Sequence, residues 1–379
     1  MSRTFGILTS GGDSPGMNAA VVSVARCAQK NGIDLMGIRR GYNGLLGKSE
    51  NPLDDIRRLR SETVLDIMDL RGTYLRTARC LEFYHPEVVD KVADDLKNKY
   101  KIDGLVVVGG DGSYRGALDL CKRGIRCVGI PGTIDNDLPY TEATLGFDTA
   151  VNVCVEAVRS IRATSRSHDR PHVVEVMGRR CGDIAMKTAM ATGAEMVIVP
   201  EMKWDIRDVI KRLNEQIANG NSRATVILCE NAWENGNMVD FPWRELLAEN
   251  GIPTHDDTQF SAKRLAQVLR ISCKIEARST VIGYTQRGAI PTAYDSAFAF
   301  EAGHLAVDLL LNETPPEDDG FAIGVHDGRV FHTSMKAAAN KSDYRPFNKK
   351  MYELINTLPY LPREDDLILV PSSRAGFTK

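Results

Sequence analysis

Short apolar runs alternate with longer amphipathic stretches over the first 146 residues of the chain. Four apolar runs have the length of strands: 5–8, 34–38, 105–108 and 127–130. Three stretches carry the apolar spacing of helices: 17–31, 86–100 and 116–122. Strands that alternate with helices in this way predict a parallel, doubly wound α/β sheet.

The same pattern starts again after residue 146, so we expect a domain boundary near 146–149. Further strands are predicted at 173–176, 196–199, 224–229 and 281–283. Helices are predicted at 149–164, 183–192 and 206–219. Residues 236–259 are polar and rich in turn formers, which indicates a surface insertion, and the stretch from 359 onward is expected to be a loosely held tail.

Composition and charge narrow the class of protein. The 379 residues are 43% hydrophobic and 26% charged, which is ordinary for a globular protein of two domains. The net charge of −2 gives no overall attraction to nucleic acid or an acidic membrane, so anion binding has to come from local arginines. The eight cysteines form no CxxC pair, no apolar run approaches ~18 residues, and no signal peptide is expected.

Glycine-rich turns with an aspartate follow three of the predicted strands. They are residues 11–16 (GGDSPG), 109–113 (GGDGS) and 132–137 (GTIDND). Glycines let backbone N–H groups approach phosphate oxygens, and a carboxylate among them can hold a metal ion or take a proton. We interpret these turns as parts of a site that binds a phosphate group and acts on it. A tight strand-to-helix turn at 11–16 and a solvated turn aspartate at Asp111 are the simpler alternatives.

Two carboxylates stand at alternate positions in the third turn, Asp135 and Asp137. In extended backbone they would share one face. One of them could then accept a hydroxyl proton while the other orients a neighbouring group. An Asx-turn with no chemical role is the alternative.

Four arginines bracket two predicted strands of the second unit. Arginine recognises phosphate through two parallel hydrogen bonds, and at a strand end it can point into a cleft. Each of them alone could be an ordinary surface charge, but together they favour a phosphate ligand. They are Arg170, Arg179, Arg278 and Arg287.

Three other side chains were weighed as site residues. Glu230 follows the strand at 224–229 and suits a sugar hydroxyl or an arginine partner. Cys80 and Tyr284 are expected by default to pack in the interior. The seven histidines show no ligand spacing, so no zinc site is expected.

Five motifs, in order and with their spacing, resemble those of the bacterial-type 6-phosphofructokinases: LTSGGDSPGMNAA, VVGGDGSYRGA, GIPGTIDND, VVEVMGRRCGD and GYTQRG. The match runs from about residue 4 to beyond residue 350. It implies two Rossmann-like α/β domains facing across a cleft, in a cytoplasmic homotetramer. The reaction implied is transfer of the γ-phosphoryl group of ATP to the C1 hydroxyl of fructose 6-phosphate.

The resemblance also implies an extent for each domain. A larger, nucleotide-binding domain would take residues 1–146 plus about 285–335. A smaller domain, which would bind the sugar phosphate, would take 147–284 plus about 336–379.

Residue roles follow from the same resemblance. Asp135 would accept the hydroxyl proton beside Thr133, and Asp111 would hold Mg²⁺ on the donor phosphates. The nucleotide would be lined by Gly12, Arg79, Cys80, Gly110, Asp111, Gly112 and Ser113. The sugar phosphate would be held by Thr133, Asp135, Met177, Gly178, Arg179, Glu230, Tyr284 and Arg287, and from a neighbouring subunit by Arg170 and Arg278. Arg79 and Arg179 would stabilise the transferring group.

The family uses either ATP or inorganic diphosphate as donor. Its diphosphate users often carry aspartate where this chain has Gly112 and lysine where it has Gly132. An aspartate at 112 would crowd and repel a nucleotide phosphate, so the two glycines favour ATP. Tyr84 and Tyr284, which replace basic residues of many members, favour the alternative of a diphosphate-dependent fructose 6-phosphate 1-phosphotransferase. A non-catalytic subunit that binds a phosphosugar is a third hypothesis, which the presence of Asp111 and Asp135 disfavours.

Overall fold

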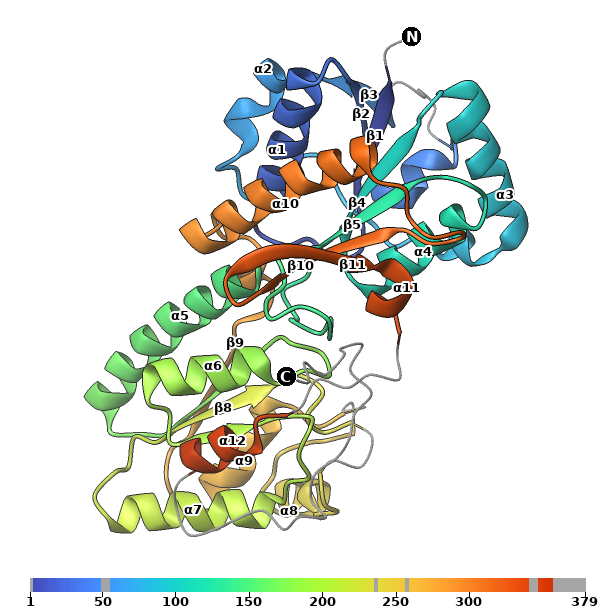
Figure 1. Ribbon diagram of the computed structural model, residues 1–379. Helices are drawn as coiled ribbons and strands as arrows, with labels where there is room; N and C mark the ends of the chain where they lie inside the picture. Colours follow the sequence, from blue (N-terminus) through green and yellow to red (C-terminus); the bar gives the residue numbers. More distant parts are fainter. Residues whose placement is uncertain (1–2, 49–54, 235–237, 256–258, 341–346, 357–379) are drawn as a thin grey trace. The chain divides into compact units, whose positions relative to one another are not determined.

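The computed structural model describes residues 3–48, 55–234, 238–255, 259–340 and 347–356. The chain divides into two compact units (Figure 1). Among the described residues, unit 1 comprises 3–48, 55–150 and 287–340, and unit 2 comprises 151–234, 238–255, 259–286 and 347–356. The long helix α5 (Phe147–His168) starts in unit 1 and continues in unit 2. Each unit is built around its own β-sheet.

The sheet of unit 1 has seven strands among the described residues, in the order β11-β10-β5-β4-β1-β2-β3. The strands are β1 (Thr4–Thr9), β2 (Asp34–Ile38), β3 (Ile56–Leu59), β4 (Gly104–Gly109), β5 (Cys127–Pro131), β10 (Phe321–His326) and β11 (Arg329–Ser334). The predicted α/β class is confirmed, but this sheet is mixed, because β3 and β11 run antiparallel to their neighbours.

A two-residue turn explains the antiparallel edge at β11. Asp327 and Gly328 connect β10 to β11 with φ of 49° and 69°. Two positive φ values in a row make the tight turn that joins antiparallel strands, whereas parallel strands need a long crossover. Alternation of strands and helices along a sequence therefore does not detect this edge.

Helices cover both faces of the unit 1 sheet, because its central strands are apolar on both sides. In β4, Val106 and Val108 pack into the cluster of α1 (Met17–Lys30) and α10 (Ala293–Asn312). Leu105 and Val107 face the opposite cluster, formed by α3 (Pro86–Asp94) and α4 (Asp111–Cys121). This is the period-two alternation of a strand buried on both faces.

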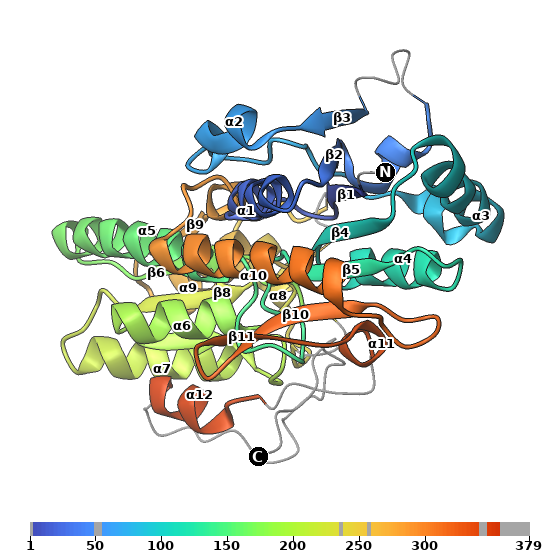
Figure 2. The same cartoon turned by 45° about the horizontal axis from the view of Figure 1, so that its top comes forward.

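The helices α1 and α10 pack directly against each other (Figure 2). Their approach depends on Gly303, since a Cβ there would lie 2.6 Å from the Cβ of Ser23. The remaining elements of unit 1 are short. They are α2 (Ser61–Val64), α11 (Met335–Ala338), the 3₁₀ turns η1 (Gly41–Leu45), η3 (Leu65–Ile67) and η4 (Leu81–Tyr84), and the π turn η5 (Asp95–Lys99) that ends the helix predicted at 86–100.

Unit 2 has a parallel sheet of four strands among the described residues, in the order β7-β8-β6-β9. The strands are β6 (His172–Val176), β7 (Met196–Ile198), β8 (Thr225–Cys229) and β9 (Arg278–Val281). The helices after α5 are α6 (Asp183–Thr192), α7 (Ile206–Ala218), α8 (Trp243–Glu249), α9 (Ala262–Ser272) and α12 (Lys349–Ile355). The strand predicted at 281–283 was misplaced, because the strand ends at Val281 and a 3₁₀ turn, η6 (Gly283–Gln286), follows.

The segment predicted as a polar surface insertion, 236–259, contains a packed helix. Trp243 and Leu247 of α8 are buried in the core of unit 2 with α9. The prediction is therefore wrong for the middle of the segment; residues 235–237 and 256–258 lie outside the described part. The tail expected from residue 359 also lies outside it. No helix in the described residues is long and apolar enough to cross a membrane.

A buried carboxylate ties two helices of unit 1 together. Asp295, in the first turn of α10, is fully buried and accepts hydrogen bonds from the backbone N–H groups of Gly146 and Thr149, both at 2.8 Å, and from the Thr149 hydroxyl. These N–H groups stand at the start of α5, where a helix offers them no acceptor of its own. Burial raises the pKa of Asp295 to about 6, although the hydrogen bonds from Thr149 and Gly146 oppose the shift.

We expect Asp295→Asn to lower the free energy of unfolding at pH 7 by about 1–3 kcal/mol, because the amide turns an N–H group toward buried donors. The loss should be about 1 kcal/mol larger at pH 5 than at pH 7. The raised pKa means that the folded state holds the carboxyl proton more tightly than the unfolded chain does. The wild type therefore loses stability relative to the variant as the pH rises from about 4 to 6. Urea denaturation at the two pH values measures both effects.

The exposed Asp308 on the same helix supplies a matched control. Asp308→Asn is expected to change the free energy of unfolding by less than about 0.5 kcal/mol, equally at both pH values. A loss for Asp295→Asn that is the same at both pH values, or larger at pH 7, would contradict the raised pKa.

Candidate active site

Three neighbouring parallel strands of unit 1 end at one level. Thr9 of β1 pairs with Val108 of β4, and Gly109 of β4 pairs with Pro131 of β5. Because β2 lies on the other side of β1, the winding of the chain reverses between β1 and β4. Such a switch point, at the carboxyl ends of the strands, is where α/β sheets bind ligands. The structure therefore brings the three glycine-rich turns to one edge of the sheet.

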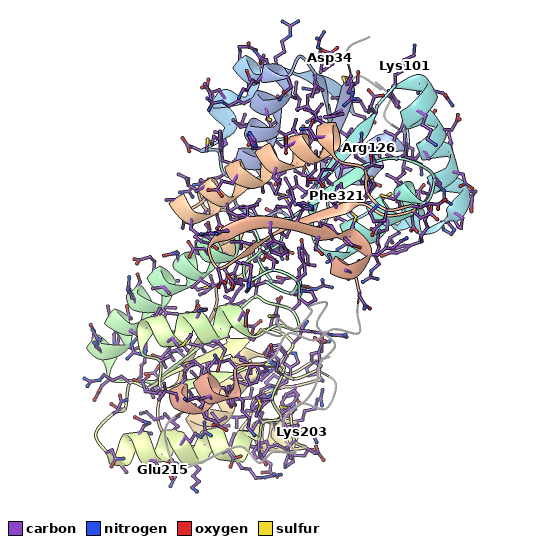
Figure 3. All side chains as sticks on the ribbon, viewed as in Figure 1. Asp34, Lys101, Arg126, Lys203, Glu215 and Phe321 are labelled. Carbon is purple, nitrogen blue, oxygen red and sulfur yellow. The ribbon has the colours of Figure 1, made fainter. Side chains whose placement is uncertain are left out.

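The opposite edge of this sheet carries none of the predicted site residues. It is marked in Figure 3 by side chains at or just before the amino ends of β2, β4, β5 and β10: Asp34, Lys101, Arg126 and Phe321. The predicted site residues of unit 1 thus lie on the side of the sheet where the parallel strands end.

The GGDGS turn leads directly into helix α4, which begins at Asp111. Gly109 must be glycine, since a Cβ there would lie 2.4 Å from the hydroxyl of Ser113 and 2.6 Å from the carbonyl oxygen of Ser10. Gly112 is the reverse case, because a Cβ there would meet nothing within 4 Å. An open helix start of this kind is suited to a phosphate group.

The first glycine turn is covered by an arginine. The guanidinium of Arg287 donates a hydrogen bond of 2.9 Å to the carbonyl oxygen of Asp13. A Cβ on Gly12 would lie 2.8 Å from Nη1 of Arg287, so glycine is what allows the guanidinium to lie on this turn. Arg287 belongs to unit 1, although its sequence motif begins in unit 2.

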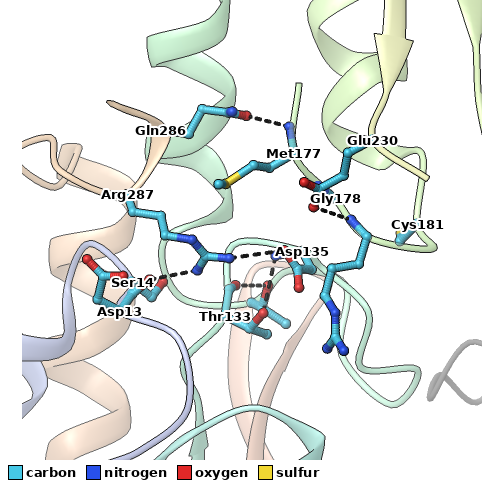
Figure 4. Close-up of polar contacts among 12 residues, drawn as sticks. Asp13, Ser14, Thr133, Asp135, Met177, Gly178, Cys181, Glu230, Gln286 and Arg287 are labelled. Atoms are coloured by element: carbon cyan, nitrogen blue, oxygen red, sulfur yellow. Dashed lines mark hydrogen bonds and ion pairs between the residues drawn. The ribbon is translucent and has the colours of Figure 1, made fainter. Parts of the chain in front are cut away.

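Arg287 also reaches the aspartate of the third turn. Its Nη2 lies 3.8 Å from Oδ1 of Asp135, and the Asp135 side chain is only 6% exposed (Figure 4). The backbone N–H of Asp135 donates to the hydroxyl of Thr133 at 3.2 Å, which fixes the two residues relative to each other. A nearly buried carboxylate that is held in place beside a guanidinium is a candidate proton acceptor.

The idea that Asp135 and Asp137 share one extended face is wrong. Asn136, between them, has a φ of 53°, which is the left-handed region and not extended backbone. Its side chain fixes this conformation by accepting a hydrogen bond of 3.0 Å from the N–H of Thr144. Asparagine tolerates left-handed backbone better than most residues do.

Arg79 and Cys80 are brought to the first glycine turn by their own segment. The hydroxyl of Thr77 donates to the carbonyl oxygen of Gly11 at 2.9 Å, and the N–H of Gly11 donates to the carbonyl oxygen of Ala78 at 3.4 Å. Arg79 is exposed and Cys80 half-buried. Burial raises the pKa of the Cys80 thiol above its usual value, so the thiol stays protonated near neutral pH.

The carboxyl ends of β6 and β8 form the corresponding place in unit 2. Gly178 and Arg179 have φ of 136° and 53°, and a Cβ on Gly178 would lie 2.4 Å from the carbonyl oxygen of Cys181. Oε1 of Glu230 accepts hydrogen bonds from the N–H groups of Gly178 (3.3 Å) and Arg179 (3.0 Å) (Figure 4). Glu230 therefore fixes the backbone of this turn, and the side chain of Arg179 is exposed.

Gln286 also holds this turn, a role that the sequence did not suggest. Its buried amide oxygen accepts from the N–H of Met177 at 3.1 Å and from the thiol of Cys154 at 3.0 Å (Figure 4). Its amide nitrogen donates to the carbonyl oxygen of Gly283 at 3.0 Å. A glutamine in a polar segment does not indicate such a role in the sequence. The role is recognised from the burial of the side chain, which only the structure shows.

Arg170 and Arg278 stand at the other edge of the unit 2 sheet. His172, the first residue of β6, pairs with Arg278, the first residue of β9, whereas Met177 and Arg179 follow the carboxyl end of β6. Four residue steps of strand separate the two edges by about 13 Å. Both arginines contact Glu276, Arg170 at 3.5 Å. Burial, and then the charges of both arginines, lower the pKa of His172 to about 4, so it is neutral at pH 7.

The default expectation that Tyr284 packs in the interior is wrong. Its side chain is 81% exposed, because it stands in the η6 turn beyond the end of β9. A phenol in that position is available to a ligand as a hydrogen-bonding group.

Asp111 fits a hard divalent cation. Mg²⁺ is bound in proteins through one or two carboxylates, with phosphate oxygens and water as its other ligands. Asp111 offers one carboxylate at the start of α4, next to the open side of Gly112. A cation held there would stand beside the N–H groups that suit a phosphate.

Comparison with known proteins points to one family. A family model described as phosphofructokinase matches residues 4–310. An ATP-dependent 6-phosphofructokinase 1 of Clostridium perfringens is 39% identical over 356 residues, which cover 94% of this chain and 99% of the relative. An ATP-dependent 6-phosphofructokinase of Lactobacillus gasseri is 43% identical over 330 residues, which cover 87% and 92%.

A solved structure of phosphofructokinase from Saccharomyces cerevisiae has a similar fold. It superposes with a TM-score of 0.74 at 29% identity and covers 89% of this chain. The chain spans 45% of that yeast chain. Since the family model matches well over half of the chain and the bacterial relatives are matched along nearly their whole length, the chain belongs to the phosphofructokinase family.

Proposed function

We propose that this protein transfers the γ-phosphoryl group of ATP to the C1 hydroxyl of fructose 6-phosphate, giving fructose 1,6-bisphosphate and ADP. The observation that carries the proposal is a nearly buried carboxylate, Asp135, at the same sheet edge as the open helix start at Asp111. The first suits a proton acceptor and the second a metal-bound phosphate donor. The reaction would take place in the cytoplasm, where ATP and hexose phosphates are both present.

Asp135 would remove the proton of the C1 hydroxyl while the oxygen of that hydroxyl attacks the γ-phosphorus. The bond to the bridging oxygen of ADP breaks in the same displacement, so ADP leaves with the electron pair. Arg287 would keep the carboxylate oriented, and Thr133 would stand beside the reacting oxygen. Phosphoryl transfer depends on such positioning and on charge neutralisation more than on covalent catalysis.

The donor would lie on unit 1. Its phosphates would meet the N–H groups at the start of α4 and the glycine turn under Arg287, and Mg²⁺ bound by Asp111 would neutralise their charge. Arg79, exposed next to the first glycine turn, would stabilise the transferring group. Lining residues are proposed as Gly12, Cys80, Gly110, Gly112 and Ser113.

The sugar phosphate would be bound by unit 2. The turn that Glu230 and Gln286 hold in left-handed backbone would present Met177, Gly178 and Arg179 to it, with Tyr284 nearby. Arg170 and Arg278 stand at the opposite edge of the same sheet and so cannot serve this turn in their own chain. Following the family resemblance, we assign them to the sugar phosphate of a neighbouring subunit in a homotetramer.

Asp135→Asn tests the proton acceptor. We expect the turnover number to fall by about 10²–10⁴-fold, because the amide cannot take the hydroxyl proton, while calorimetry shows nearly unchanged binding of fructose 6-phosphate. Asp119→Asn, at a half-buried position on α4, is the control and should keep normal kinetics. An unchanged turnover number would remove Asp135 from the role. Binding of the sugar phosphate by the wild type without turnover on ATP or diphosphate would point to a non-catalytic subunit.

Gly112→Asp tests the donor. A carboxylate next to Asp111 should lower kcat/KM for ATP by about 100-fold, because two neighbouring negative charges repel a nucleotide phosphate. Gly112→Ala fits the open space and serves as the control that keeps the ATP reaction. Lysine at position 132 is less informative, since its Cβ would lie 3.0 Å from Val108 and 3.2 Å from the backbone N of Gly109. A wild type that prefers diphosphate over ATP at equal concentration would overturn the choice of donor.

Mixed oligomers test the crossing of a subunit boundary. Asp135→Asn and Arg278→Ala are each expected to be nearly inactive at low fructose 6-phosphate, the second because a charge-assisted contact to phosphate is lost. Reassembly of an equal mixture should restore about a quarter of the wild-type activity, since one site in four then combines an intact base with an intact arginine. A mixture of Asp135→Asn with Asp111→Asn should restore nothing, because both residues come from one unit of one chain. Rescue in neither mixture would mean that Arg278 does not act on the site of a neighbouring subunit.

A further inference from the structure

The carboxylate proposed to hold the metal is held by an arginine of its own helix. Nε of Arg115 donates to Oδ1 of Asp111 at 3.1 Å, and Nη2 donates to Oδ2. The guanidinium therefore contacts both carboxylate oxygens from one turn further along α4. The side chains are 38% and 21% exposed, so both can be reached by a ligand.

This pair has two opposing consequences. An acid four residues before a base stabilises a helix by only a few tenths of a kcal/mol, and exposed pairs are worth about 0–1 kcal/mol. A cation near the start of a helix is unfavourable with respect to the helix dipole. A bidentate guanidinium nevertheless occupies the oxygens that a metal would use, and a metal and a guanidinium repel each other at that distance. The Arg115–Asp111 pair is therefore weak enough for a metal to displace the guanidinium from Asp111. The arginine then has to move away from the metal.

We propose that Arg115 is a further donor-binding residue, which holds Asp111 when no donor is bound and moves to the donor phosphates when the metal–nucleotide occupies Asp111. A phosphate oxygen that shares a metal with Asp111 lies within about 4 Å of the carboxylate oxygen, since each metal–oxygen bond is about 2.1 Å. A side chain that reaches Asp111 in the free protein also reaches such an oxygen. The open side of Gly112 leaves room for this movement.

The exchange predicts opposite changes in two binding equilibria. Without Arg115 the metal alone meets less competition at Asp111 and binds more tightly. The metal–nucleotide loses a charge-assisted contact to its phosphates and binds more weakly. A role in folding alone would weaken both equilibria together.

The experiment uses Arg115→Met, which removes the charge and keeps a long side chain with good helix propensity. Binding of Mn²⁺ alone is followed by water proton relaxation with Asp111→Asn as the baseline, and binding of MgADP by calorimetry. We expect Mn²⁺ to bind about two- to fivefold more tightly at Asp111. We expect MgADP to bind about tenfold more weakly. Arg115→Lys keeps a positive charge but lacks the two parallel donors of a guanidinium. Its affinities should lie between those of the wild type and those of Arg115→Met.

The control stands at the C-cap of the same helix and is Lys122→Met, which breaks the pair of Lys122 with Asp119 and should change neither equilibrium. Both affinities weakened together, both unchanged, or no Asp111-dependent binding of Mn²⁺ in Arg115→Met would overturn the inference.

The inference rests on the proposed role of Asp111, and the same measurements separate the two. A wild type that binds no MgADP would contradict the proposed function itself, whatever Arg115 does. Normal binding of MgADP by the wild type, with both equilibria unmoved by Arg115→Met, would remove Arg115 alone.

Discussion

The register of three parallel strands is the constraint on which unit 1 depends. Pairing of Thr9 with Val108, and of Gly109 with Pro131, ends β1, β4 and β5 at one level. Three turns far apart in the sequence then share one edge, at the point where the winding of the sheet reverses. The start of α4 and the covering of Gly12 by Arg287 both lie at this edge of unit 1, because the three strands end there together.

Two carboxylates on this edge are paired with arginines. Arg115 holds Asp111, and Arg287 stands by Asp135. Such pairing keeps carboxylates from repelling a phosphate that approaches them, while both arginines remain able to contact it. This edge of unit 1 therefore carries two carboxylate–guanidinium pairs.

The main feature of unit 2 is a strained turn after β6, which other side chains hold in place. Left-handed backbone at Arg179 is costly for a residue with a Cβ, and the turn persists because Glu230 and Gln286 accept its N–H groups. The arginines at the opposite edge of the same sheet, Arg170 and Arg278, share Glu276 and lower the pKa of His172. Two edges of one small sheet thus carry separate sets of polar residues.

The α/β class, the central strands and the turns that follow them could be predicted from the sequence, because apolar runs and glycines act locally. The family motifs supplied the candidate residues that this edge of unit 1 brings together. The antiparallel edge strands, the helix at Trp243, the left-handed Asn136 and the burial of Gln286 and Asp295 became visible only in the folded chain. These depend on partners distant in the chain, such as the N–H of Thr144 for Asn136 and the start of α5 for Asp295, and spacing along a sequence does not encode such partners.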